Sequence, residues 1–145
     1  MRPTLTIAAT LAIAATAALA HTGVKDPQVM ARMDGMKLMA DHTKTLGQMA
    51  RGRIAFDNTK ALAALEGLKS ETDRIPALFA PRAADPKSEA KSEIWTDSAG
   101  FKASTAQMAN ALNLADVASP EALAGSMRAI AAACSACHKD YRIEN

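Results

Sequence analysis

The sequence has few of the residues that favour β-strands. It contains three valines and only five aromatic side chains, whereas Ala, Leu, Met, Lys and Glu, which favour helices, dominate it. It also lacks any run of lysine or arginine, and its 17 basic residues nearly balance its 15 acidic ones. A near-neutral surface of mixed sign argues against nucleic acid as a partner. The composition therefore predicts an all-α protein that does not bind nucleic acid.

Long apolar runs are absent except at the N-terminus. Residues 5–18 carry no charge, follow Arg2, and lead into Ala18-Leu19-Ala20, the small-x-small pattern that a signal peptidase cuts. The run is too short and too rich in alanine for a convincing membrane span, so an uncleaved anchor is the weaker alternative. We predict a signal peptide over residues 1–20, cleaved after Ala20, and export to the periplasm. Residues 21–145 then form one domain without stable membrane insertion.

Helix breakers divide this domain into four predicted helical segments. The first begins at Asp26-Pro27, a capping residue followed by proline at the first helical position, and runs to about Gly47 or Gly52. The second follows Asp57-Asn58. The third fades after Ala115, and the fourth begins at Ser119-Pro120-Glu121. Three prolines between the second and third segments predict a loop that is not helical: Pro76, Pro81 and Pro86.

Three of these segments carry an apolar stripe, at steps of three and four residues in the second and fourth and of seven and four in the third, which is the periodicity of a helical bundle. The stripes are Ala61, Leu65, Leu68, Thr72 and Ile75; Ile94, Phe101, Met108 and Leu112; and Leu123, Met127, Ile130, Cys134, Cys137 and Tyr141. Alanine-rich helices bury little area each, so a core of these side chains alone would be thin. A large apolar cofactor inside the bundle would supply the missing buried surface.

The two cysteines of the chain lie in the pentapeptide Cys134-Ser-Ala-Cys137-His138, which matches C-x-x-C-H, the attachment signature for c-type haem. Positions i, i+3 and i+4 share one face of a helix. Two thiols one turn apart can add to the two vinyl groups along one porphyrin edge, and the next residue points an imidazole at the iron. We therefore predict one haem c, bound through two thioethers, with His138 as the proximal iron ligand.

Three alternatives compete for this motif. A redox dithiol would lie at a helix N-terminus after a strand, whereas this pair comes near the end of an alanine-rich helix. A zinc site would need four ligands, and the only other histidines are His21 and His42. A disulfide between neighbours one turn apart closes a small loop and stabilises little.

Any protein ligand on the other side of the iron must come from upstream, because no methionine or histidine follows His138. The first predicted helix is rich in methionine: Met30, Met33, Met36, Met39 and Met49. Such a cluster is more often core filler than a set of ligands. His42 lies about 240° round the helix from Met36, so the two cannot both face the haem, and a solvated histidine is its default interpretation.

Over essentially the whole predicted mature length, the chain resembles the class II c-type cytochromes, the cytochrome c′ group of four-helix bundles. The resemblance is carried by "ARMDGMKLMADH" in the first helix, by "ALF-P" and "SEIWTDSAGFK" around the third, and by "CSACHKDYR" at the end. It implies an antiparallel left-handed four-helix bundle with the haem between helices one, two and four. Dimerisation through the first two helices is common in the family, so a homodimer is a possible assembly.

The resemblance also implies roles for particular residues. It places Met36 over the distal face of the haem, and Arg32, one turn earlier, beside the haem edge or a propionate. It places Arg142 near the proximal histidine, and it matches Trp95 and Phe101 to aromatic side chains of the haem pocket.

The family divides at the distal position into high-spin proteins that bind small gases and low-spin proteins that ligate a methionine and carry electrons. We expect a periplasmic electron carrier with His138 and Met36 as axial ligands, no enzyme activity, and redox proteins of the periplasm as partners. The alternative is a five-coordinate protein that binds NO or CO. A weaker alternative is a haem-free bundle with a dithiol or metal-binding role.

Overall fold

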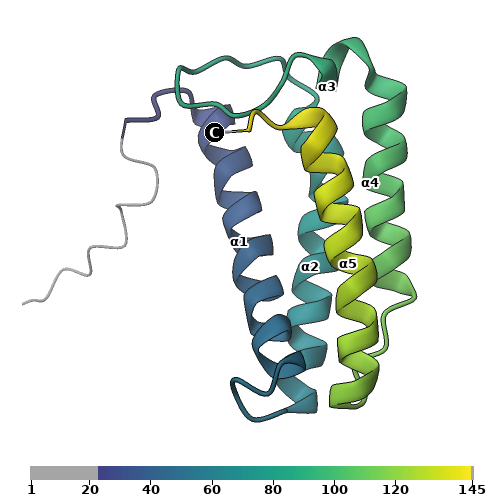
Figure 1. Cartoon of the computed structure of the whole chain (residues 1–145). Coiled ribbons are helices and arrows are strands. Elements are labelled where there is room, and N and C mark those ends of the chain that lie inside the picture. Colours follow the sequence, from purple (N-terminus) through teal and green to yellow (C-terminus); the bar gives the residue numbers. More distant parts are fainter. Residues whose placement is uncertain (1–22, 145) are drawn as a thin grey trace, which may run out of the picture.

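The computed structural model describes residues 23–144, in which all regular structure is helical apart from one isolated antiparallel bridge between Ala90 and Arg142 (Figure 1). The helices are α1 (Pro27–Ala50), α2 (Asn58–Phe79), α3 (Glu93–Thr96), α4 (Ser98–Asn113) and α5 (Pro120–Tyr141). This confirms the predicted all-α class. The predicted signal peptide lies outside the described residues.

The four long helices form an antiparallel bundle, as predicted. Helix α1 packs on α2, α2 on α4, α4 on α5 and α5 on α1, while α3 is a single turn at one end. The first residues of α1 and the last residues of α5 lie at that same end, beside the long segment that connects α2 to α3 (Figure 1). Within residues 23–144 there is no helix with the length and apolar character that crossing a membrane requires.

Three of the long helices, α1, α2 and α5, begin where the capping residues predicted. The Asp26 carboxylate accepts hydrogen bonds from the backbone N–H groups of Gln28 and Val29, and Asp57 accepts one from Lys60. The Ser119 hydroxyl accepts from Ala122 and precedes the proline that opens α5. Each of these side chains satisfies backbone donors that have no partner inside the helix.

Two predicted boundaries are wrong. Helix α2 continues through Pro76 to Phe79, although the prolines predicted a loop from that position. Its last turn persists because side chains satisfy its end carbonyls: Gln28 and Arg32 donate to the Leu78 carbonyl oxygen, and Trp95 donates to that of Phe79. The third predicted segment is divided at Asp97 into α3 and α4, and the Asp97 carboxylate caps α4 by accepting from the Gly100 N–H.

The hydrophobic core is most complete towards the end of the bundle opposite α3. Five of the largest fully buried side chains lie in the middle or at that end of the long helices: Leu46, Leu68, Leu112, Leu123 and Ile130. The whole predicted stripe of α2, from Ala61 to Ile75, is buried, as expected. We call this half of the bundle the closed half and the half next to α3 the open half.

Candidate functional site

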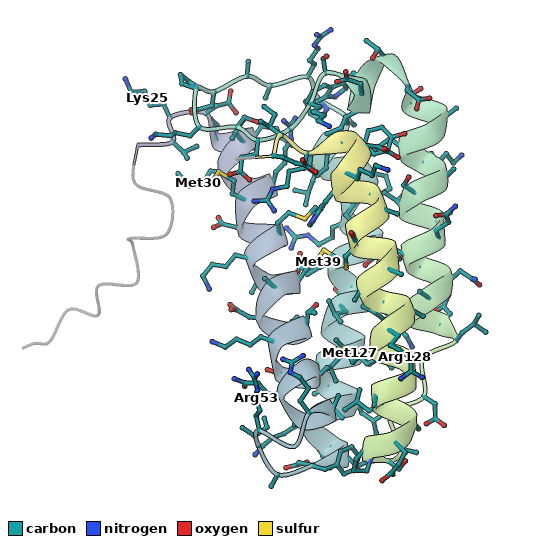
Figure 2. The ribbon with its side chains drawn as sticks, in the orientation of Figure 1. Lys25, Met30, Met39, Arg53, Met127 and Arg128 are labelled. Atoms are coloured by element: carbon teal, nitrogen blue, oxygen red, sulfur yellow. The ribbon has the colours of Figure 1, made fainter. Side chains whose placement is uncertain are left out.

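A cavity of about 770 Å³ lies between α1 and α5, and its lining runs along α1 from Val29 to Gly47 and Arg51. Helices α1 and α5 form opposite walls, and the end of α2, the segment around Glu89, α3 and the start of α4 close the top. Figure 2 shows the Met39 side chain between α1 and α5. The apolar lining residues are Val29, Met33, Met36, Met39, Ala40, Phe79, Ala90, Ile94, Phe101, Met127 and Ala131. A cavity of this size and character suits a large apolar ligand with few polar groups.

The C-x-x-C-H motif opens into this cavity. Cys137 and His138 line it, while Cys134, one turn earlier, is half-buried with its Sγ 3.9 Å from the Sδ of Met108 on α4. Both cysteines are free thiols. Burial raises the pKa of both thiols, and the charges of Cys134 and Asp140 raise the pKa of Cys137 further. The thiols are therefore protonated at neutral pH.

His138 is held in its neutral form. Burial lowers the pKa of its imidazole, and the positive charge of Arg142 lowers it further, while Glu89 opposes the shift. The neutral imidazole has a nitrogen lone pair available for a metal, whereas the protonated ring has none.

The turn of α5 that carries His138 is tied to the rest of the open half through two side chains. The Tyr141 hydroxyl donates to Asp97 Oδ2 at 2.8 Å, next to Gly100, where a Cβ would overlap with both groups. Arg142 Nε donates to Glu89 Oε2 at 2.7 Å and forms an ion pair with the same carboxylate.

Backbone contacts add to this anchoring. The Lys91 N–H donates to the Tyr141 carbonyl oxygen at 3.0 Å, and the Ile143 N–H donates to that of Glu89 at 2.8 Å. The Lys91 ammonium also donates to the Lys139 carbonyl oxygen at 2.8 Å. These bonds fix the end of α5, and with it the imidazole, against the segment that closes the cavity.

Arg32 is a buried cation in the cavity wall, with 3% of its surface exposed. Its Nε donates to the Leu78 carbonyl oxygen at 2.9 Å, and its other nitrogens donate to the carbonyls of Pro81 and Ala83. The guanidinium carbon lies 5.0 Å from the Phe79 ring centroid and 5.2 Å from that of Trp95. Arg32 therefore joins α1 to the end of α2, which is a structural role that the sequence did not predict.

The two aromatic residues predicted for the pocket take different positions. Phe101 lines the cavity and packs against Phe79 and Tyr141, with ring centroids 5.4 and 5.2 Å away. Trp95 does not line the cavity. Its ring packs against the guanidinium of Arg32, and its Nε1 donates to the Phe79 carbonyl oxygen at 2.8 Å.

Three methionines of α1 line the cavity: Met33, Met36 and Met39. Met39 is buried and belongs to the core cluster, whereas Met33 and Met36 are half-buried. Met36 lies one turn after Arg32 on the same face of α1. His42 is half-buried on another face, with its ring over Gly67 of α2.

The surroundings of the cysteine pair differ from those that a redox dithiol or a zinc site requires. The pair lies far from the N-terminus of α5, and burial raises both thiol pKa values, whereas a reactive dithiol depends on a lowered one. In the part of the chain that the structure describes, no group of three or more His, Cys, Asp or Glu side chains is placed to hold a metal ion.

Sequence reasoning missed two parts of the lining. One is the segment of Ser88, Glu89 and Ala90, which is held at the cavity by the bridge between Ala90 and Arg142 and by the bonds of Glu89 to Arg142 and Ile143. The other is a row of cations along α1 and at its C-terminal cap: Lys37, Lys44 and Arg51. The spacing of seven residues in this row was visible in the sequence.

The residues present fit a covalently attached haem. Two protonated thiols one turn apart and a neutral imidazole lie on α5. Of these, the Cys137 thiol and the His138 imidazole line the apolar cavity. Cys134 and Cys137 would hold the porphyrin, and His138 would hold the iron. The methionines of α1 supply sulfur on the opposite wall.

Comparisons with known proteins agree with this interpretation. The sequence model described as Cytochrome C' matches residues 27–142. Cytochrome c' of Pararhodospirillum photometricum is 30% identical over 116 residues, which cover 77% of this chain and 92% of the relative.

Solved structures give the same result. Cytochrome c' from Rhodobacter Spheriodes superimposes with a TM-score of 0.76 at 28% identity, covering 82% of this chain and 97% of that one. A nitric oxide complex of a leucine-to-alanine mutant of cytochrome c prime from Alcaligenes xylosoxidans superimposes with a TM-score of 0.74 at 26% identity, covering 82% and 95%.

Proposed function

Because the chain belongs to the cytochrome c′ family and binds covalently attached haem c, we propose that it is an electron carrier of the periplasm with His138 and Met36 as the axial iron ligands. The observation that carries the proposal is the position of Met36: it lies half-buried in the wall of the cavity formed by α1, while His138 lines the opposite wall formed by α5. The N-terminal signal-like sequence supports export.

The bound haem supplies an iron that alternates between its ferrous and ferric forms. The chain's own contribution is to hold the ligands still. The bonds from Tyr141 to Asp97 and from Arg142 to Glu89 fix the turn of α5 that carries His138. Arg32 fixes the opposite wall by joining α1 to the Leu78 carbonyl at the end of α2 and to the Ala83 carbonyl after it. A carrier that keeps both ligands in both oxidation states needs little reorganisation, and a methionine ligand raises the reduction potential.

The test compares three thioethers that line the same cavity. Wild-type ferrous protein, Met36→Ala, Met33→Ala and Met39→Ala are mixed with carbon monoxide at neutral pH, and the ferric spectra are recorded. We expect wild type and the two control variants to resist carbon monoxide and to show a far-red sulfur-to-iron band. Met36→Ala should bind carbon monoxide promptly and lose the band.

The second candidate function is the binding of small gases at a vacant iron site. It is supported by the similar structure of a relative in complex with nitric oxide. Prompt and complete binding of carbon monoxide by the wild-type ferrous protein would contradict methionine ligation and establish this candidate. Loss of the far-red band in Met33→Ala instead of Met36→Ala would identify Met33 as the iron ligand and contradict our assignment of Met36.

A further inference from the structure

The charge of the chain is unevenly distributed around the cavity. Five cationic side chains and one carboxylate, Glu89, line it, which is a surplus of four positive charges. The whole chain has a surplus of only two, so the residues outside the cavity lining carry a net negative charge. The two propionates of a bound haem would reduce the surplus at the cavity to two positive charges, leaving it positive.

Three of these cations form a row along one edge of the cavity. Lys37 and Lys44 of α1 and Arg51, the residue that caps its C-terminal end, are exposed and follow one another at intervals of seven residues. Seven residues are close to two helical turns, so the three share one face and stand about 10 Å apart along the axis. We call these three residues the cationic row.

The cationic row is only partly neutralised. Lys37 pairs with Asp41 at 2.6 Å, but neither Lys44 nor Arg51 forms an ion pair with a carboxylate in the range 23–144. The one carboxylate of the cavity lining, Glu89, pairs with Arg142. Two cations at the rim are thus available to a partner.

Gly47 supports the position of the last member of the row. The Arg51 guanidinium folds back over Gly47, where a Cβ would lie 3.1 Å from Arg51 Nη1. Because glycine has no side chain, the guanidinium can lie along α1 at the cavity instead of extending from the end of the helix.

We infer that the cationic row is the docking surface for an acidic electron-transfer protein, which approaches the haem through the rim of the cavity beside α1. The inference rests on the proposed function. A partner with a row of carboxylates would be oriented by Lys44 and Arg51 with its redox centre towards the cavity. Exposed charges of this kind act mainly on the rate of association and on orientation, and salt weakens their effect.

The first experiment measures the sign of the charge at the site of electron transfer. The ferrous holoprotein is oxidised by ferricyanide, an anion that takes one electron and becomes ferrocyanide, over a range of salt concentrations. A cationic tris-phenanthroline cobalt(III) complex serves as the opposite probe. We expect the rate with ferricyanide to fall as salt rises, and the rate with the cobalt complex to rise.

A pair of variants with the same net charge locates the effect. Lys44→Gln/Arg51→Gln should slow oxidation by ferricyanide several-fold at low salt and flatten its salt dependence. The matched control, Lys60→Gln/Lys102→Gln, removes two exposed cations from α2 and α4, outside the cavity lining, and should change the rate much less. Equal effects of the two double variants would overturn the inference, because they would show a response to net charge alone.

The second experiment uses an acidic probe of peptide size. A decapeptide of glutamate is titrated into the ¹⁵N-labelled ferrous holoprotein, and the shifted amides should cluster between Lys37 and Arg51. Shifts elsewhere, or no binding, would contradict the docking surface, as would binding of phosphatidylglycerol vesicles in preference to the peptide. Carbon monoxide binding on the same samples distinguishes the two proposals: a vacant iron would contradict the electron carrier while the ferricyanide result still reports on the cationic row.

Discussion

The closed and open halves of the bundle are held together by different interactions. In the closed half, Leu46, Leu68 and Leu112 are completely buried where α2 packs directly on α1 and α4. The cavity separates α1 from α5 along most of α1, and in the open half polar contacts between distant segments tie its walls together. The bond from Arg32 to the Leu78 carbonyl at the end of α2 and the bond from Tyr141 to Asp97 are the main examples.

The difference follows from the site. A cavity that accepts a cofactor offers little apolar contact of its own until the cofactor is bound, so its walls need directional bonds to keep their spacing. Leucine packing in the other half needs no such bonds. We infer that side-chain packing in the closed half provides most of the stability of the fold, while polar bonds in the open half fix the spacing of the cavity walls.

The largest expected effect comes from removing the thiols. In Cys134→Ser/Cys137→Ser, covalent attachment of haem should be lost completely, because no sulfur remains to form the thioethers. A haem stain after denaturing electrophoresis should be negative for the double variant and positive for wild type. Hydrogen exchange should then increase at amides around Arg32 and Tyr141 far more than at amides around Leu68.

A different pattern of hydrogen exchange would contradict the distinction between the two halves. Equal loss of protection in both halves would show that the haem stabilises the whole bundle as one unit. In that case the closed half would not be an independent source of stability.

A smaller effect is expected from shortening one side chain in each half of the holoprotein. Leu68→Ala leaves a void among completely buried side chains and should reduce the free energy of unfolding by about 2–5 kcal/mol. Met33→Ala shortens a side chain that is only half-buried in the wall of the cavity, so its effect should be clearly smaller. Urea unfolding of the ferric proteins measures both. A larger loss for Met33→Ala would contradict the assignment of packing energy to the closed half.

The fold could be predicted from the sequence because its determinants are local. Capping residues at Asp26, Asp57 and Ser119 mark the helix starts, and steps of three and four residues mark the buried faces. The failure at Pro76 has the opposite cause. The last turn of α2 is retained by Gln28 and Arg32, and no local pattern announces donors some fifty residues away.

The candidate site was predictable to a similar extent. The spacing of Cys134, Cys137 and His138 is a property of one helix, and the motif indicates a cofactor without knowledge of the fold. The cavity lining depends on which segments meet in space. The bridge between Ala90 and Arg142 and the position of Trp95 behind Arg32 arise from chain crossings that periodicity does not encode.

The smallest expected effect concerns the hydrogen bond that fixes the turn carrying His138, and it appears only at high pH. Burial, the hydrogen bond to Asp97 and the negative charge of Asp97 together raise the pKa of Tyr141 to about 12. The unfolded chain loses the phenolic proton near the ordinary pKa of about 10, while the folded chain keeps it. Between these values the folded state binds more protons, so stability falls as pH rises.

Urea midpoints of the ferric holoprotein between pH 9 and 12 should therefore decline more steeply for wild type than for Tyr141→Phe, which has no phenolic proton to lose. Asp97→Asn removes the charge but keeps an acceptor, and it should give an intermediate slope. Identical slopes for all three proteins would show that the Tyr141 contact contributes nothing to holding the open half together.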